Sequence, residues 1–108
     1  RFDAVLCDVP CSGSGAWRRQ PEAKWALTPE RLAELHALQD SILQQATAFV
    51  APRGILAYAT CSMLPSENVE RIESFLKKNA NWRLKVQKKF TPLDGGDGFF
   101  IAGLIRQD

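Results

Sequence analysis

The sequence has few of the residues on which disulfide-linked and metal-binding proteins depend. It contains three cysteines and one histidine in 108 residues, and no two cysteines stand in a Cys-x-x-Cys spacing. An odd number of cysteines without paired spacing argues against a disulfide framework, and a single histidine leaves few ligands for zinc. We therefore expect reduced thiols, which suit the cytoplasm, and no bound metal.

Long apolar runs and a strong net charge are also missing. No stretch approaches the roughly 18 apolar residues that cross a bilayer, so we expect no membrane association. The formal net charge of +2 is too small to indicate by itself a protein that binds nucleic acid. The cations are nevertheless clustered, first at Arg18, Arg19 and Lys24 and again from residue 71 to residue 89. A solvated helix face explains the later cluster at least as well as RNA contact.

Two apolar, β-prone runs each end beside a cysteine in a small, polar setting. Residues 4–7 lead through Asp8 to Cys11, and residues 54–60 lead directly to Cys61. In an open α/β sheet, ligands bind just beyond the carboxyl ends of the strands. If the two runs are parallel strands of one sheet, Cys11 and Cys61 emerge at the same edge and face one substrate. A two-thiol active site is therefore the leading hypothesis.

Helices are predicted between and after these strands. Thr28 and Pro29 form a helix start, with a hydroxyl cap and a proline at the first helical position. Apolar residues then recur at helical spacing as far as Phe49, and residues 51–54 should end this helix and turn the chain into the second strand. Ser66 is expected to cap a second helix.

The last third of the chain predicts two more strands. One carries its apolar residues on a single parity: Trp82, Leu84, Val86 and Phe90. This parity favours a half-exposed strand, and a turn at residues 95–98 leads to a closing strand over residues 99–105. The order predicts an α/β fold that corresponds to the second half of a Rossmann-like sheet. It would contain two parallel strands with crossover helices and a terminal antiparallel strand pair.

The two cysteine motifs resemble those of the RNA cytosine-5 methyltransferases, which include bacterial 16S ribosomal RNA cytosine methylases and nucleolar and tRNA relatives. The resemblance is carried first by Asp8-Val9-Pro10-Cys11-Ser12-Gly13 and by Thr60-Cys61-Ser62. Three further stretches match in the same order: Arg18-Arg19-Gln20-Pro21-Glu22 with Trp25, Pro65-Ser66-Glu67-Asn68, and Asp97-Gly98-Phe99-Phe100. The similarity runs from about Phe2 to Ile105, nearly the whole chain.

The resemblance implies a role for each site residue. Cys61 matches the nucleophile that adds to carbon 6 of cytosine and thereby activates carbon 5 towards the methyl group. Cys11 matches the residue that helps to release the product. Asp8 matches an acid that contacts the cytosine and the cofactor, S-adenosylmethionine, and Pro10 stiffens the same loop beside the cofactor. Arg18 and Arg19 are candidates for contact with RNA phosphate.

The resemblance also places residues 1–108 in the C-terminal part of a methyltransferase catalytic domain. In the family, the glycine-rich turn that cradles S-adenosylmethionine lies in the preceding half, and no such turn is found here. We therefore expect the 108-residue chain alone to be inactive. The substrate would be ribosomal or transfer RNA, and the sequence leaves the oligomeric state open.

Two alternatives and several structural interpretations stand beside this hypothesis. A DNA cytosine-5 methyltransferase uses one Pro-Cys nucleophile on the first loop, and the second cysteine motif argues against it. A non-catalytic RNA-binding module would have little use for both cysteines and Asp8. Cys7 is expected to be a buried core residue, and Trp25 and Trp82 are expected in the core. His36 is interpreted as an incidental surface or boundary residue.

Overall fold

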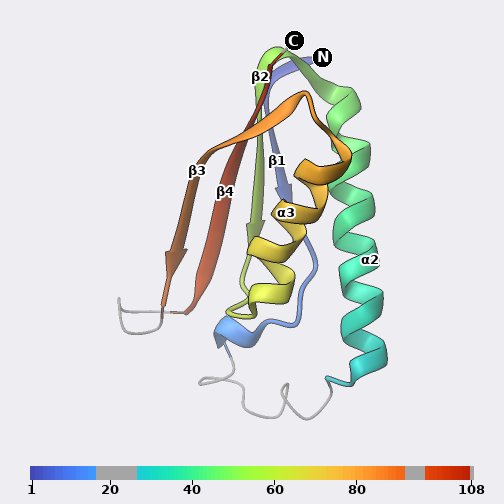
Figure 1. Ribbon diagram of the computed structural model, residues 1–108. Helices are drawn as coiled ribbons and strands as arrows, with labels where there is room; N and C mark the ends of the chain where they lie inside the picture. The colour runs from blue at the N-terminus through green and yellow to red at the C-terminus, as the bar shows by residue number, and fades with distance from the viewer. Residues whose placement is uncertain (17–26, 92–96, 108) are drawn as a thin grey trace.

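The computed structural model describes residues 1–16, 27–91 and 97–107. The elements run in the order β1 (Phe2–Asp8), α2 (Pro29–Ala46), β2 (Val50–Thr60), α3 (Val69–Lys78), β3 (Trp82–Phe90) and β4 (Phe99–Arg106). Short 3₁₀ turns separate them: η1 (Ser14–Ala16), η2 (Thr47–Phe49) and η3 (Pro65–Glu67). The four strands form one sheet in the order β1-β2-β4-β3 (Figure 1).

The strand directions confirm the predicted α/β fold. β1 and β2 are adjacent and parallel, and β4 is antiparallel to both β2 and β3. β4 lies between β2 and β3, an insertion that the sequence did not predict, so β3 runs in the same direction as the first two strands. The carboxyl ends of β1, β2 and β3 therefore share one edge of the sheet, at the bottom of Figure 1. This is the edge at which an α/β sheet binds its ligands.

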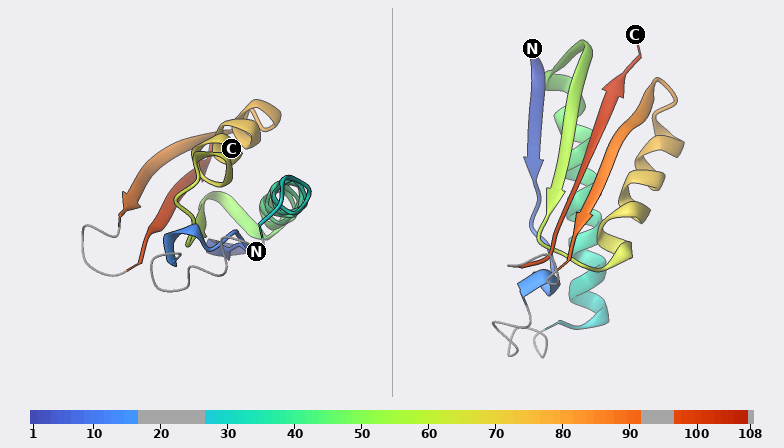
Figure 2. Two further views of the ribbon diagram at one scale, coloured as in Figure 1. Left: turned by 90° about the horizontal axis from the view of Figure 1, so that it is seen from below. Right: turned by 90° about the vertical axis from the view of Figure 1, so that its left-hand side faces the viewer.

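The two helices of the described residues, α2 and α3, lie on the same face of the sheet (Figure 2). The core lies between these helices and the sheet. It includes Leu43 of α2, Ile72 of α3 and the strand residues Leu56, Tyr58 and Leu104, which are all buried. On the opposite face no helix of the described residues covers the strands. Leu6 is 65% exposed there and Val86 57% exposed.

The two predicted helix starts have different outcomes. Thr28 caps α2 as expected, because its hydroxyl accepts a hydrogen bond from the backbone N–H of Arg31 at 3.1 Å. Ser66 does not cap α3, which begins at Val69 after the 3₁₀ turn η3. The Ser66 hydroxyl instead pairs with Nε2 of His36 at 3.0 Å. His36 is therefore half-buried and joins α2 to η3.

The predicted turn at residues 51–54 lies within β2 as an irregularity. The pairing with β1 shifts between Phe2, which faces Val50, and Ala4, which faces Ile55. Arg53 takes a positive φ of 65°, the left-handed conformation that most residues avoid. The chain therefore bulges without leaving the sheet, which β-bulges at strand ends commonly do.

β3 is more exposed than its sequence parity indicated. Trp82 is buried against Phe75, with ring centroids 5.7 Å apart. Beyond Leu84 the register with β4 shifts, so that Leu84 faces Leu104 while Val86 faces Gly103. Leu84 and Val86 consequently lie on opposite faces of the sheet, because paired residues share a face.

Candidate active site

The two cysteine loops leave neighbouring strands at the same sheet edge. In the parallel pair of β1 and β2, Asp8 lies beside Ala59, and the backbone N–H of Val9 donates to the Ala59 carbonyl at 3.1 Å. Cys61 follows the last residue of β2 and Cys11 comes three residues after the end of β1. The predicted adjacency of the two loops is confirmed.

The three cysteines occupy three different environments. Cys61 is exposed, Cys11 is half-buried and Cys7 is buried, as expected for a core residue. Burial raises the pKa of Cys11 to about 11, and the negative charges of Cys61 and Glu67 push this pKa in the same direction. Hydrogen bonds from the backbone N–H groups of Gly13 and Cys61 act against this rise in pKa. The Cys11 sulfur thus lies beside the Cys61 backbone, and its thiol is protonated at neutral pH.

A buried glutamate joins the two loops. The Glu67 side chain is fully buried and accepts four hydrogen bonds. Its Oε1 accepts from the hydroxyls of Ser12 and Ser62, each at 2.5 Å. Its Oε2 accepts from the Ser12 backbone N–H at 2.8 Å and from Nε2 of Gln39 at 3.0 Å. Ser12 follows Cys11 and Ser62 follows Cys61, so one carboxylate contacts the residue after each cysteine.

A second set of hydrogen bonds orders the Cys61 loop. The Thr60 hydroxyl donates to Oδ1 of Asn68 at 2.7 Å and accepts from the Ser62 backbone N–H at 3.1 Å. The Asn68 side-chain amide donates to the Ser62 carbonyl at 2.8 Å. The Ser14 hydroxyl lies 3.1 Å from that of Ser62 and accepts from the Met63 backbone N–H at 2.7 Å. The loop is therefore held on both sides of Cys61.

Backbone hydrogen bonds connect three segments at this end of the sheet: the Cys11 loop, the Cys61 loop and the residue before β4. The N–H of Gly15 donates to the Cys61 carbonyl, and the N–H of Gly98 donates to the Gly15 carbonyl, both at 2.9 Å. A Cβ on Gly15 would lie 2.5 Å from each of the carbonyl oxygens of Cys61 and Gly98. Gly15 is therefore required by the approach of neighbouring backbones. Gly98 directly precedes β4, so the start of that strand is connected to the two cysteine loops.

The other predicted site residues lie around this arrangement. Asp8, the last residue of β1, and Pro10, two residues later, are both exposed, and the Pro10 carbonyl accepts from Nε2 of Gln39 at 2.9 Å. Arg18 and Arg19 lie outside the described residues, as does Trp25.

Sequence reasoning missed Glu67 and Gln39 as site residues. From its neighbours alone, Glu67 is an acid just after the expected cap Ser66, a position where acids favour the helix dipole. Two signals were present: Glu67 belongs to the matching stretch after the second cysteine, and Gln39 is a polar residue on the apolar stripe of α2. A polar residue at a core position requires hydrogen-bond partners, which here are Glu67 and the Pro10 carbonyl.

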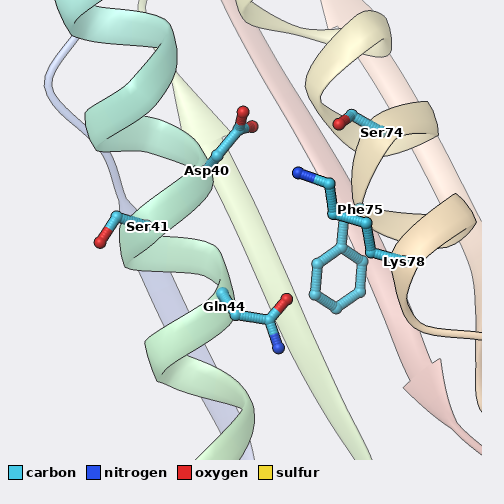
Figure 3. Close-up of a pocket in the computed structure, with 6 residues that line it drawn as sticks. All are labelled: Asp40, Ser41, Gln44, Ser74, Phe75 and Lys78. Carbon is cyan, nitrogen blue, oxygen red and sulfur yellow. The ribbon is translucent and has the colours of Figure 1, made fainter.

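Two surface hollows lie near the helices, and neither is lined by a cysteine. One, of about 230 Å³, lies between α2 and α3 (Figure 3). It is lined by Asp40, Ser41, Gln44, Ser74, Phe75 and Lys78. The other, of about 220 Å³, adjoins the Cys61 loop. It is lined by Pro65, Asn68, Val69, Gln87, Lys89 and Phe100.

Metal-binding clusters and membrane-spanning helices are both absent from the described residues. Nowhere in the described ranges do three or more His, Cys, Asp or Glu side chains gather as they would around a metal ion. Neither helix combines the length and the apolar character that a membrane span needs, as far as the structure describes the chain.

Comparison with known proteins gives close relatives over the whole chain. Ribosomal RNA small subunit methyltransferase B of Photorhabdus laumondii is 42% identical over 115 residues, which cover 99% of this chain and 27% of that protein. The protein of the same name from Pasteurella multocida is 43% identical, over 96% of this chain and 26% of its own length. The chain thus spans about a quarter of the length of the curated relatives it matches.

A solved structure and a family match agree with these relatives. The methyltransferase homologue from Pyrococcus horikoshii superposes with a TM-score of 0.81 at 26% identity, covering 98% of this chain and 39% of that one. The family described as 16S rRNA methyltransferase RsmB/F matches residues 1–105, a range that includes both cysteine loops and Glu67. The chain therefore belongs to the RsmB/F family of 16S rRNA methyltransferases.

Proposed function

We propose that this chain is the thiol-bearing part of an enzyme that methylates carbon 5 of cytosine in RNA. The observation that carries the proposal is the pair of cysteine loops at one sheet edge, with an exposed Cys61 and a half-buried Cys11 beside it. The relatives named for ribosomal RNA methylation favour ribosomal RNA over transfer RNA as the substrate.

The environments of the two thiols suit two different roles. Cys61 is exposed, so its thiolate reaches carbon 6 of a cytosine and forms the covalent bond that makes carbon 5 nucleophilic. After methyl transfer, a water molecule takes the carbon 5 proton, the ring double bond re-forms, and the bond between carbon 6 and sulfur breaks with its electron pair on the Cys61 sulfur. The Cys11 thiol, whose pKa burial raises to about 11, keeps its proton at neutral pH. It therefore has a proton to give to the departing Cys61 thiolate.

The methyl donor that the resemblance implies is S-adenosylmethionine, which supplies an electrophilic methyl group when bound. Asp8 and Pro10 are exposed at the end of β1, so a carboxylate and a rigid ring border any molecule beside this loop. These residues fit one wall of a cofactor site. Asp8 would accept hydrogen bonds from the donor or from the cytosine amino group.

The sheet itself supports a position within a larger catalytic domain. β1 is an edge strand, and exposed apolar side chains such as Leu6 lie on the face that the helices leave open. Exposed apolar area of this kind marks a contact surface. We infer that the preceding half of a methyltransferase sheet packs here and supplies the rest of the cofactor cradle. Residues 1–108 alone should therefore lack activity.

Substitution of each cysteine tests the proposal in the full-length protein. Cys61→Ala should abolish both methylation and the covalent protein–RNA adduct, because the nucleophile is gone. Cys11→Ala should permit attack but slow release, so the adduct should accumulate on denaturing gels. Cys7→Ala is the matched control, since it removes a thiol outside the site and should leave both readouts near wild type. An adduct with Cys61→Ala and none with Cys11→Ala would reverse the two roles.

A further inference from the structure

Glu67 stands out because a fully buried carboxylate is costly unless it is well satisfied. Its four hydrogen bonds come from two serine hydroxyls, one backbone N–H and the amide of Gln39. Its own backbone carbonyl accepts from the buried Tyr58 hydroxyl at 2.6 Å. A buried carboxylate is rarely retained in a core unless its hydrogen bonds select one arrangement of the surrounding chain.

The arrangement that Glu67 specifies is the relative position of the two cysteine loops. Ser12 and Ser62 are 50 residues apart in sequence, and both donate to the same atom, Oε1. The two serines therefore cannot separate without breaking a hydrogen bond to the carboxylate. Gln39 fixes the other oxygen from α2 and also holds the Pro10 carbonyl, so the Cys11 loop is tied to the helix layer as well.

We propose that Glu67 is a positioning residue that holds the Cys11 loop in register with the Cys61 loop, so that both thiols face one cytosine. The catalytic part of this role, orienting the thiols towards a cytosine, rests on the proposed function. The structural part, the alignment of the two loops, rests on the hydrogen bonds alone. Orientation of this kind is valuable to an enzyme, because a misplacement of about 1 Å costs about 100-fold in rate.

Charge gives this role a signature that a purely structural residue would lack. Burial is the largest cause of the raised pKa of Cys11, and the negative charges of Cys61 and then of Glu67 make smaller contributions in the same direction. Removing that charge should lower the pKa of Cys11. Loosening the loop should lower it further, because the thiol would be less buried.

The test compares Glu67→Gln with Glu70→Gln, which changes an exposed acid in the same segment. In the full-length protein, the alkylation of Cys11 by iodoacetamide is followed against pH by mass spectrometry of the peptide that carries this residue. Cross-linking of Cys11 to Cys61 by a diazene oxidant is measured in parallel. Glu67→Gln should move the Cys11 alkylation profile to lower pH and slow the cross-linking about tenfold. Glu70→Gln should change neither.

Ser12→Ala is a second variant in case Glu67→Gln does not fold. It removes one hydroxyl donor and keeps the buried carboxylate. It should slow cross-linking in the same direction but by less. If Glu67→Gln or Ser12→Ala folds and leaves both the Cys11 profile and the cross-linking rate unchanged, the positioning role is wrong.

Measuring methylation by the full-length protein distinguishes a failure of this proposal from a failure of the proposed function on which it rests. Glu67→Gln should lower kcat about tenfold or more with little change in KM for RNA. If the wild-type protein methylates no cytosine while the thiol readouts still respond to Glu67→Gln, the proposed function fails and the positioning of the loops stands.

Discussion

At the scale of residues, the two site cysteines differ because their surroundings differ. Cys61 projects from the end of β2 into solvent, whereas Cys11 is half-buried and desolvation raises its pKa. A thiol that keeps its proton at neutral pH is a poor nucleophile and a suitable proton donor. The division of labour that we propose, attack by Cys61 and release assisted by Cys11, rests on this difference in burial.

The raised pKa of Cys11 predicts a loss of stability in alkali. An unfolded thiol loses its proton near its ordinary pKa of 9.0, while the folded Cys11 keeps it until about 11. Between these values the folded chain binds more protons than the unfolded chain, so the free energy of unfolding falls as pH rises. Buried Tyr58 also has a raised pKa and acts in the same direction at higher pH.

Urea unfolding at pH 8 and at pH 10 measures this effect, with Cys11→Ala as the comparison. The wild-type chain should lose more stability between the two pH values than the variant, because only the wild type carries the Cys11 thiol. Equal losses would show that Cys11 titrates at its ordinary pKa in the folded state.

The sequence predicts the position of the two cysteines, but it does not predict the hydrogen-bond partners of Glu67. Cys11 and Cys61 follow runs whose composition predicts strands, and the ends of parallel strands share an edge. The burial of Glu67 depends on donors from β1's loop, from α2 and from its own loop, which are brought together only by the folded chain. No local pattern around Glu67 records those partners.

At the scale of elements, local chemistry predicted which segments form helices and strands, and long-range pairing decided the rest. The cap at Thr28 and the strand before Cys61 were predicted from neighbouring residues. The insertion of β4 between β2 and β3 was not, because a strand's place in a sheet depends on partners distant in sequence. The start of α3 was misplaced because Ser66 bonds His36 instead of its own helix.

The close packing of the loops at this end of the sheet predicts that alanine lowers the free energy of unfolding more at Gly15 than at Gly13. Gly15→Ala should lower the free energy of unfolding by about 2 kcal/mol, because its Cβ would overpack against two backbone carbonyls. Gly13→Ala meets no atom within 4 Å, and its positive φ of 72° should cost about 1 kcal/mol.

Urea denaturation of the two alanine variants provides the measurement. Thiol alkylation of Cys61 should also quicken in Gly15→Ala, since its loop would lose a hydrogen bond. A Gly15→Ala chain as stable as Gly13→Ala would mean that the three segments are not packed as closely as their hydrogen bonds indicate.

At the scale of the whole molecule, the two faces of the sheet differ in how well they are covered, and its two outer strands, β1 and β3, differ in composition. The helices cover one face, and the other exposes apolar residues from β1 and β3. The two edge strands also differ: β3 carries lysines such as Lys85 and Lys88, which discourage pairing with another strand, whereas β1 is apolar through most of its length. This asymmetry supports packing of further chain against β1, in keeping with relatives about four times as long.

The most direct measurement of the central claim identifies the cysteine that bonds to the base. The full-length protein is incubated with S-adenosylmethionine and an RNA that carries 5-fluorocytidine at the target position. Fluorine replaces the carbon 5 proton, so the elimination that releases the enzyme cannot proceed and the adduct persists. Protease digestion and mass spectrometry should then find the modified nucleotide on the peptide of Cys61, at the sulfur of that residue. A nucleotide bound to Cys11, or methyl transfer with no adduct at either cysteine, would contradict the account.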